Sequence, residues 1–321
     1  MAERGIPAGT HDVVIVGGGP AGLTTGLYAA RANLNTVLCE GSGTVSQITI
    51  TDLIENYPGL PDVTGFELIN RFREQAIRFG LTVKAEEVLE IAPRALGDVM
   101  GWKVTTGGGE YRACAVIVAT GAAWRRLGVP GEEGLIGKGV SFCATCDGPF
   151  YRNREVVVVG GGDTAVQEAL FLTRFASRVT IVHRRGRLRA TGVLRDRAFA
   201  NKKIEFAWES VVSEIRGENA VTGVVVKSVK LPGDTREIPA EGAFIFIGLN
   251  PLTQLVRHLV HCDDGGYITV DSTMRTSAPG IFACGDCTKK SLRQVVTACG
   301  DGATAAHAAE LYIDELKGQA Y

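Results

Sequence analysis

The stretch DVVIVGGGPAG, residues 12–22, decides the fold. A short apolar run from Val13 to Val16 ends in a Gly-x-Gly-x-x-Gly turn, and the segment after it, LTTGLYAARANL, has apolar residues at helical spacing. A strand, a glycine turn and a helix in this order predict a dinucleotide site, because glycines let the backbone approach a pyrophosphate at the start of a helix. The expected contacts of this first turn are Gly17, Gly19, Pro20, Ala21 and Gly22.

The next apolar segment, NTVLCE, predicts a second strand that ends in Glu40. A carboxylate at this place accepts hydrogen bonds from ribose hydroxyls and repels a 2′-phosphate. The first turn is therefore expected to hold a nucleotide whose ribose hydroxyls are free. The alternative is a glycine turn of an α/β domain that binds nothing.

The same pattern recurs in EVVVVGGGDTA, residues 155–165, which is again followed by a helix-like segment and by a strand, RVTIV, that leads into His183. His183 lies at the same offset from Gly160 as Glu40 does from Gly17, so the two turns are copies of one motif. The expected contacts of the second turn are Gly160, Gly162, Asp163, Thr164 and Ala165.

The second copy carries positive charge where the first carries negative charge, in the run HRRGRLR at 183–189. Arginines at this place pair with a 2′-phosphate, so the second turn is expected to prefer NADPH over NADH. A solvated basic face and a nucleic-acid patch are the alternatives. The expected contacts are His183, Arg184, Arg185 and Arg189.

Composition and segment order set the architecture. A chain of 321 residues is long enough for two domains. The segments VIVATG at 116–121 and TSAPGIFACGD at 276–286 predict strands, and a helix rich in small residues begins near 292. The C-terminal piece has no glycine turn of its own, so we expect it to complete the first domain. The prediction is an α/β protein with two Rossmann-like, three-layer, dinucleotide-binding domains, in which residues 122–249 are inserted between residues 1–121 and 250–321.

The remaining composition excludes several function classes. The formal net charge is −1, which gives no field that would recruit nucleic acid or a membrane surface. Eight scattered cysteines do not form a secreted disulfide framework, and no signal peptide or apolar run of roughly 18 residues is present. The histidines lack metal-ligand spacing, so no metal site is expected. A cytoplasmic location follows as the expectation.

Two C-x-x-C pairs stand in this chain. In SFCATCDGPF, residues 141–150, Cys143 and Cys146 could form a disulfide staple, half of a metal site, or a redox centre. The second pair is Cys284 and Cys287, too far along the chain from Cys146 for the spacing of a zinc ribbon. We interpret this second pair as small packing residues.

The motifs together resemble those of the low-molecular-weight thioredoxin reductases over nearly the full length. The matching segments are GGGPAG at 17–22, ENYPG at 55–59, ATGA at 119–122, CATCDG at 143–148, GGGDTA at 160–165, HRR at 183–185, GIFACGD at 280–286 and RQ at 293–294.

The resemblance implies FAD in the first domain, NADPH in the second, and a redox-active Cys143–Cys146 disulfide. Electrons would pass from NADPH through FAD and this disulfide to thioredoxin. Cys146 resembles the thiol that meets the flavin, Cys143 the thiol that attacks thioredoxin, and Asp147 the acid–base residue. The resemblance also implies a homodimer.

Further residues are assigned to the flavin by their positions in the matching motifs. One departure from the family is Val45-Ser46, where it usually has two glycines, so side chains are expected close to the flavin. The assigned residues are Gln47, Asn56, Ala119, Thr120, Gly121, Gly285, Asp286, Arg293 and Gln294.

Three other functions compete with this interpretation. A flavin-dependent dithiol oxidase would have no need of the basic run at 183–189. A reductase of another disulfide protein, or one supplied by another electron donor, would share most of the motifs. A flavin-binding sensor would bind FAD without steady NADPH consumption.

Overall fold

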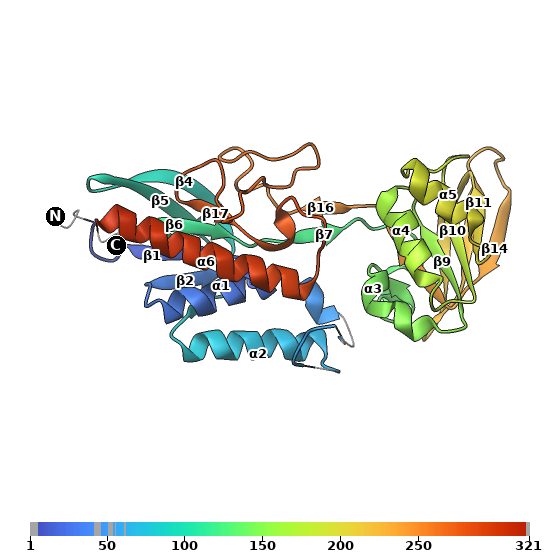
Figure 1. Ribbon diagram of the computed structural model, residues 1–321, viewed down its shortest axis with the longest axis horizontal. Coiled ribbons are helices and arrows are strands. Elements are labelled where there is room, and N and C mark those ends of the chain that lie inside the picture. The colour runs from blue at the N-terminus through green and yellow to red at the C-terminus, as the bar shows by residue number, and fades with distance from the viewer. Residues whose placement is uncertain (1–5, 42–45, 51–53, 55, 61, 319–321) are drawn as a thin grey trace. The chain divides into compact units, whose positions relative to one another are not determined.

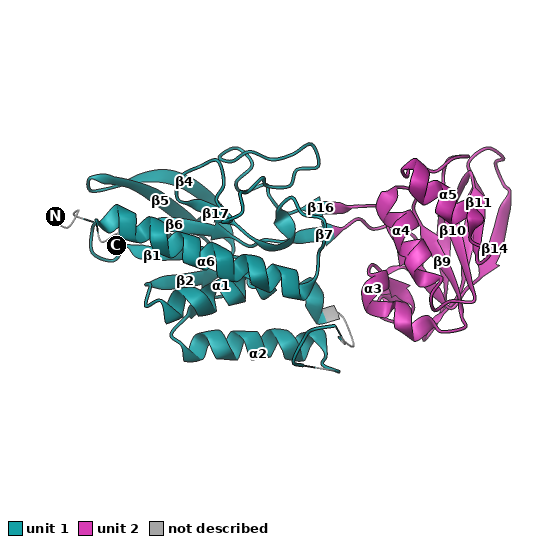
Figure 2. Ribbon diagram, viewed as in Figure 1, with its two compact units in different colours: residues 1–123, 250–321 teal, residues 124–249 magenta. Residues whose placement is uncertain are grey.

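The computed structural model describes residues 6–41, 46–50, 54, 56–60 and 62–318 (Figure 1). The chain divides into two compact units (Figure 2). Unit 1 comprises Met1–Ala123 and Asn250–Tyr321, and unit 2 comprises Trp124–Leu249. Unit 2 is therefore an insertion in the sequence of unit 1. The two segments at this boundary, β7 (Ala122–Trp124) and β16 (Leu249–Pro251), pair as a two-stranded sheet.

Unit 1 is built around a mainly parallel sheet with the order β3-β2-β1-β6-β5-β4, and β17 also pairs with β6. Helix α1 packs against both α6 and α2, while β4 and β5 form an antiparallel extension. The elements are β1 (His11–Val16), α1 (Pro20–Arg31), β2 (Thr36–Cys39), η1 (Gln47–Ile50), α2 (Gly65–Arg78), β3 (Thr82–Lys84), β4 (Val88–Leu96), β5 (Val99–Thr106), β6 (Gly109–Val118), β17 (Ile281–Ala283), η4 (Gly285–Cys287) and α6 (Val295–Lys317).

Unit 2 contains a parallel sheet with the order β11-β10-β9-β15-β8 and an antiparallel sheet with the order β12-β13-β14. Its elements are η2 (Glu133–Leu135), β8 (Val140–Ser141), α3 (Ala144–Asp147), η3 (Gly148–Tyr151), β9 (Glu155–Val159), α4 (Asp163–Leu172), β10 (Arg178–His183), α5 (Gly192–Ala200), β11 (Ile204–Trp208), β12 (Ser210–Gly217), β13 (Val221–Ser228), β14 (Thr235–Pro239) and β15 (Gly242–Ile245).

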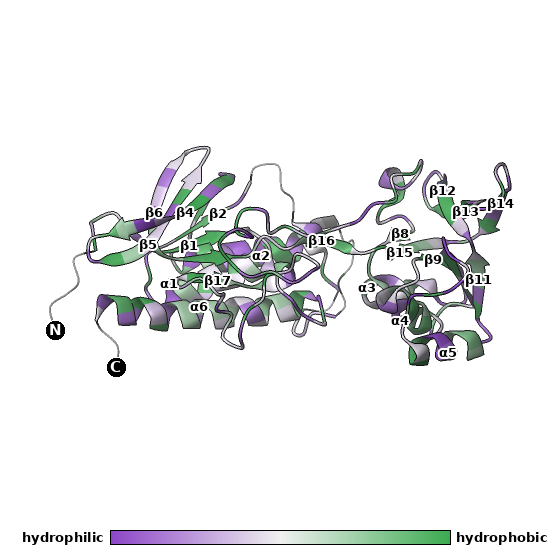
Figure 3. Ribbon diagram, turned by 90° about the horizontal axis from the view of Figure 1, so that it is seen from above, coloured by the Kyte–Doolittle hydropathy of each residue, from purple (hydrophilic) through white to green (hydrophobic). Residues whose placement is uncertain are grey.

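The central strands are continuous apolar runs because both of their faces are buried. In β1, Val13 and Ile15 join one apolar cluster while Val14 and Val16 join a second cluster. Strand β9 divides its valines between two clusters in the same way. Figure 3 shows the apolar composition of the strands around β1 in green.

The α/β class with two Rossmann-like units is confirmed. One predicted strand is shorter in the structure. The strand expected within 276–286 covers only Ile281–Ala283, because the chain before it turns at Gly280. None of the described helices combines the length and apolar composition that crossing a membrane requires.

Candidate active site

The first glycine turn is a closely packed backbone cradle. Gly17 has a φ of +111°, a conformation that favours glycine. A side chain at Gly22 would overlap the carbonyl oxygen of Gly17, and one at Gly18 would overlap the carboxylate of Glu40. Gly19 is the N-cap residue of α1. Since glycine has no side chain, it makes no capping hydrogen bond to the first N–H groups of this helix. The first N–H groups of α1 are therefore suited to a pyrophosphate.

Glu40 lies directly after β2, where it approaches this turn and also meets a partner that the sequence did not predict. Arg73 of α2 donates from both terminal nitrogens to the two carboxylate oxygens of Glu40, at 2.6 and 2.8 Å. The two side chains are 30% and 21% exposed, respectively, so the fork-like pair is only partly screened by solvent. This contact fixes the direction of the carboxylate that was assigned to a ribose.

Asp286 supplies an observation that fits a bound polar group. Its Oδ1 is one of two buried side-chain atoms of the described residues that have no hydrogen-bond partner. Burial raises the pKa of this carboxyl group, an effect that Lys290 and Arg293 partly oppose. The neighbouring Gly285 N–H donates to Asp301 at 3.0 Å, and Asp301 is paired with Lys290. Hydroxyl groups of a ligand, such as those of a ribityl chain, would donate the hydrogen bond that Asp286 Oδ1 lacks.

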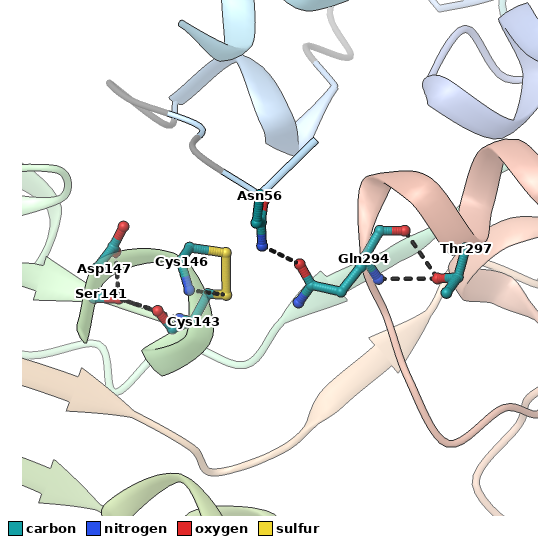
Figure 4. Close-up of a disulfide and its surroundings, with 7 residues drawn as sticks. All are labelled: Asn56, Ser141, Cys143, Cys146, Asp147, Gln294 and Thr297. Carbon is teal, nitrogen blue, oxygen red and sulfur yellow. Dashed lines mark hydrogen bonds between the residues drawn. A yellow bond between two sulfur atoms is a disulfide. The ribbon is translucent and has the colours of Figure 1, made fainter. Parts of the chain in front are cut away.

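Two of the residues assigned to the flavin, distant in sequence, meet directly. Asn56 Nδ2 donates to Gln294 Oε1 at 3.0 Å (Figure 4). Gln294 is also the N-cap of α6, where it and Thr297 form a reciprocal capping box. Unit 1 thus brings a loop near residue 56 to the start of its last helix.

Arg293 is held by backbone groups. Its guanidinium donates to the carbonyls of Asp286, Lys290 and Thr288 at 3.3–3.5 Å, and it lies 4.3 Å from the centre of the Tyr267 ring. These hydrogen bonds of Arg293 stabilise the conformation of the segment that carries Asp286.

The other assigned positions of unit 1 lie in backbone turns. The Ala119 N–H donates to Val16 at 2.8 Å, Thr120 Oγ1 donates to the Leu252 carbonyl at 2.5 Å, and Gly121 has a φ of +72°. Gln47 begins η1, and Ser46 Oγ lies 3.5 Å from the place of a Cβ on Gly19. The expected side chain at Ser46 thus approaches the first turn. Val45 and Glu55 lie outside the described residues.

The second glycine turn has the same plan with different chemistry. Gly160 has a φ of +149°, and a side chain at Gly161 would overlap the ring of His183. Gly162 precedes α4, whose first residue Asp163 accepts a hydrogen bond from the Thr191 N–H at 2.7 Å. Ala165 stands where the first turn has a glycine, and Thr164 lies exposed in the first turn of α4.

His183 and the arginines after it form a basic loop folded onto this turn. His183 is 7% exposed, and its Nε2 is the other buried, unpartnered atom among the described side chains. Burial lowers the pKa of His183, and Arg189 and Arg185 lower it further. The Arg189 N–H donates to the Gly161 carbonyl at 2.7 Å, while Arg184, Arg185 and Arg189 are exposed. A phosphate group fits this set of donors.

The redox candidate lies in the same unit as the basic loop. Cys143 and Cys146 form a disulfide with Cα atoms 5.3 Å apart, and both residues are half-buried. The Cys146 N–H donates to Cys143 Sγ at 3.1 Å. Asp147 ends α3, and its Oδ2 accepts a 2.6 Å hydrogen bond from Ser141 Oγ (Figure 4). A purely structural disulfide would add little stability here, because the pair closes a very short loop.

The second cysteine pair lies in a different environment. Cys284 and Cys287 are free thiols with no exposed surface. Burial raises the pKa of both, that of Cys287 to about 11. A neutral buried thiol is a poor nucleophile, which agrees with a packing role. Among the described residues, no cluster of three or more His, Cys, Asp and Glu side chains is arranged to hold a metal ion.

The sequence did not predict three polar residues that contact these sites: Arg73, Ser141 and Glu168. The carboxyl group of Glu168 accepts a hydrogen bond from the Ala144 backbone inside the redox turn, and burial raises its pKa. None of the three belongs to a matched motif. Arg73 and Glu168 contact their partners only through the packing of separate elements, whereas Ser141 contacts Asp147 and Cys143 within its own segment of the chain. In the sequence, these positions could have been noticed only as polar residues among mainly apolar neighbours.

Comparisons with known proteins agree with this geometry. Residues 11–302 match the model of the family described as pyridine nucleotide-disulphide oxidoreductase. The chain is 47% identical over 309 residues to a thioredoxin reductase of Listeria monocytogenes, which covers 96% of this chain and 95% of the relative. It is 46% identical over 308 residues to a thioredoxin reductase of Bacillus subtilis, covering 96% of each chain.

Solved structures give the same result. The crystal structure of thioredoxin reductase from Streptococcus pyogenes matches with a TM-score of 0.89 and 46% identity, over 96% of this chain and 100% of that one. Thioredoxin reductase from Giardia duodenalis matches with a TM-score of 0.88 and 38% identity, over 94% and 98% of the two chains. This chain therefore belongs to the pyridine nucleotide-disulphide oxidoreductase family, as a relative of the thioredoxin reductases that its sequence motifs resemble.

Proposed function

We propose that the chain is an NADPH-dependent thioredoxin-disulfide reductase. The observation that carries this proposal is the half-buried Cys143–Cys146 disulfide with Asp147 beside it. The relatives named thioredoxin reductase match nearly the whole chain, which supports thioredoxin as the substrate. Electrons pass from NADPH, by way of FAD, to this disulfide and then to the disulfide of thioredoxin.

Residues 1–121 and 250–321 form the FAD-binding domain in this proposal, and residues 122–249 form the NADPH-binding domain with the redox pair. The thioredoxin reductases of this family use FAD and NADPH. The unpartnered Asp286 Oδ1, the Gly17 cradle and Glu40 fit FAD. The unpartnered His183 Nε2 and the exposed arginines after it fit the phosphate-bearing ribose of NADPH.

The remaining assignments follow the same division. The FAD contacts are Gly17, Gly19, Pro20, Ala21, Gly22, Glu40, Gln47, Asn56, Ala119, Thr120, Gly121, Gly285, Asp286, Arg293 and Gln294. The NADPH contacts are Gly160, Gly162, Asp163, Thr164, Ala165, His183, Arg184, Arg185 and Arg189.

The protein's own chemistry is thiol–disulfide exchange. FAD, when bound, supplies the conversion between a two-electron hydride and a dithiol, which sulfur alone cannot perform. Cys143 acts as the thiolate that attacks thioredoxin, Cys146 closes the disulfide again, and Asp147 moves the proton between them and the departing thiols.

The working form in this proposal is a cytoplasmic homodimer that binds neither nucleic acid nor a membrane. The near-neutral net charge supports the lack of nucleic-acid and membrane binding, and the absence of a cysteine framework typical of secreted domains supports the compartment. The dimer is an expectation from the family resemblance alone. Light scattering of the purified protein, with a monomer mass as the contrary result, tests the dimer.

NADPH oxidation by the FAD-loaded protein, with and without thioredoxin, tests the activity. We expect rapid oxidation only with thioredoxin, and its loss in Cys143→Ser and Cys146→Ser proteins that still bind FAD. Consumption of oxygen without thioredoxin would indicate a dithiol oxidase instead. Tight FAD binding with no NADPH oxidation by any disulfide would indicate a sensor.

A further inference from the structure

Ser141 connects the redox turn to the acid beside it. This residue is 3% exposed at the end of β8, two residues before Cys143. Ser141 Oγ lies 2.6 Å from Asp147 Oδ2, and the Cys143 N–H donates to the same Oγ at 3.1 Å (Figure 4). One hydroxyl therefore joins the backbone of the attacking cysteine to the carboxylate of the acid–base residue.

The distances decide where the hydroxyl proton goes. A hydroxyl has one proton to donate, and Ser141 Oγ has two acceptors within reach, Asp147 Oδ2 at 2.6 Å and the Cys143 carbonyl at 3.3 Å. A separation of 2.6 Å is typical of a hydroxyl that donates to an ionised carboxylate. The Cys143 N–H fills a lone pair of the same oxygen and so polarises the hydroxyl toward the carboxylate.

Two titratable groups near Asp147 come from η3 and α4, which pack against α3. Tyr151 of η3 has its pKa raised to about 12, by burial first and then by the charge of Asp147, so it stays neutral in the working range. Glu168 of α4 accepts from the Ala144 backbone, and burial raises the pKa of its carboxyl group. Arg154 and Glu241 act on Tyr151 as well, and Cys143 and Cys146 belong to the same turn as Asp147.

We propose that Ser141 is a positioning residue for Asp147, which holds this carboxylate in one orientation and stabilises its ionised form. This inference rests on the proposed function, in which Asp147 accepts and returns a proton during exchange. Ser141 itself touches neither the substrate nor the reacting sulfur atoms in this role.

The exchange step shows why the ionised form matters. The Cys143 thiolate attacks one sulfur of the substrate disulfide, whose S–S bond breaks and whose other sulfur leaves with the electron pair. The Cys146 thiol gives its proton to Asp147 and attacks Cys143 Sγ, which re-forms the protein disulfide and releases the second substrate sulfur as a thiolate. Asp147 returns the proton to one departing thiolate, so two electrons have passed to the substrate.

A carboxylate that must accept a proton is inactive once protonated, so the exchange rate falls as pH drops through the pKa of Asp147. A hydrogen bond that favours the ionised form lowers this pKa. Replacing Ser141 by Ala therefore moves the acid side of the pH–rate profile upward, by about one to two pH units. Ser141→Thr keeps the hydroxyl and is expected to keep the wild-type profile.

The test measures exchange in a single turnover under anaerobic conditions. FAD-loaded protein with its disulfide opened by dithiothreitol is mixed rapidly with oxidised thioredoxin and, separately, with dithiobis(nitrobenzoate), across the pH range. The proteins are wild type, Ser141→Ala, Ser141→Thr, Asp147→Asn and the Ser141→Ala/Asp147→Asn double variant. Ser210→Ala is the matched control, because Ser210 is also a buried serine of unit 2 but its hydroxyl donates to the Trp208 carbonyl, at 2.7 Å.

The expected result is an upward shift in Ser141→Ala alone, with no effect of Ser141→Ala when Asp147 is already Asn. An unshifted Ser141→Ala profile overturns the proposal, as does an equal shift in Ser141→Thr or a further loss in the double variant. If Ser141→Ala fails to retain FAD, the profile of Ser141→Thr against Ser141→Gly decides in the same way. Wild-type protein that exchanges with the small disulfide and not with thioredoxin refutes the proposed function, while the shift still tests Ser141.

Discussion

The two glycine turns share a backbone and differ in the side chains that meet it. In unit 1 the residue after the second strand is Glu40, which is paired with Arg73. In unit 2 the same place holds His183, which is followed by exposed arginines. Gly22 of the first turn is Ala165 in the second, and the first glycine of each turn has a φ of +111° in unit 1 and +149° in unit 2.

This difference separates what the backbone recognises from what the side chains select. Both turns present the start of a helix, which suits any pyrophosphate. In the proposed assignment, the side chain after the second strand reaches the ribose, so its charge decides whether a free hydroxyl or a 2′-phosphate is accepted. On the proposed assignment, changes at a few positions adapt a duplicated motif to two cofactors.

The largest expected effect comes from exchanging the two small residues that differ between the turns, Gly22 and Ala165. Gly22→Ala adds a methyl group that overlaps the Gly17 carbonyl, and relieving this overlap must open the turn, at a cost of about 1–3 kcal/mol. We expect the purified variant to have lost most of its FAD, measured by its flavin absorbance. The reciprocal Ala165→Gly removes a methyl group and costs about 1 kcal/mol, with the KM for NADPH little changed. Wild-type flavin content in Gly22→Ala would show that the turns are interchangeable.

The next effect tests the charge difference. Replacing Arg184 and Arg185 together by Gln removes the groups assigned to the 2′-phosphate. Losing a charged hydrogen bond costs about 1.5–3 kcal/mol, so we expect the KM for NADPH to rise about 10- to 100-fold. The KM for NADH should hardly change, because NADH has no phosphate there. Steady-state kinetics with both nucleotides measure this, and an equal change for both would remove the assignment of these arginines.

These turns also show how far the sequence determines what was predicted. The order of strand, glycine turn and helix is local, so the spacing of apolar and glycine residues was enough to predict β1, α1, β9 and α4. The contact of Arg73 with Glu40 is not local, because it depends on how α2 packs in unit 1. The contacts of Ser141 with Cys143 and Asp147 are local, but they depend on the fold of the short turn that holds the disulfide, which no apolar or glycine spacing determines. The Asn56–Gln294 hydrogen bond joins residues 238 positions apart, and only the family resemblance placed both near one ligand.

A smaller effect tests the support of Glu40. Arg73→Gln removes the fork that orients the carboxylate, and the partial exposure of the pair limits the loss to about 1 kcal/mol. We expect FAD to dissociate about 3- to 10-fold more readily, measured by the rise of flavin fluorescence on dilution. Arg73→Lys keeps the charge without the fork and should be intermediate. Arg178→Gln, which breaks the more exposed Arg178–Glu155 pair of unit 2, is the control. If Arg73→Gln released FAD at the wild-type rate, Arg73 would not be the residue that orients Glu40 for FAD.

The smallest effect concerns His183, which holds the place in the second turn that Glu40 holds in the first. Burial, Arg189 and Arg185 lower the pKa of His183 below its ordinary value of 6.5, so the folded protein resists protonation that the unfolded chain accepts. His183 therefore contributes stability above about pH 6.5, and this contribution is lost as pH falls through the lowered pKa.

We expect the melting temperature of the wild type to fall more between about pH 7 and about pH 5 than that of His183→Gln, measured by calorimetry. His258→Gln, which changes an exposed histidine of unit 1, should follow the wild type. Saturating NADP⁺ should reduce the difference, because the 2′-phosphate offsets the arginine charges that oppose protonation of His183. If His183→Gln and the wild type lose the same stability on acidification, the ring is not held neutral by its surroundings. The second turn would then select its ribose through the arginines alone.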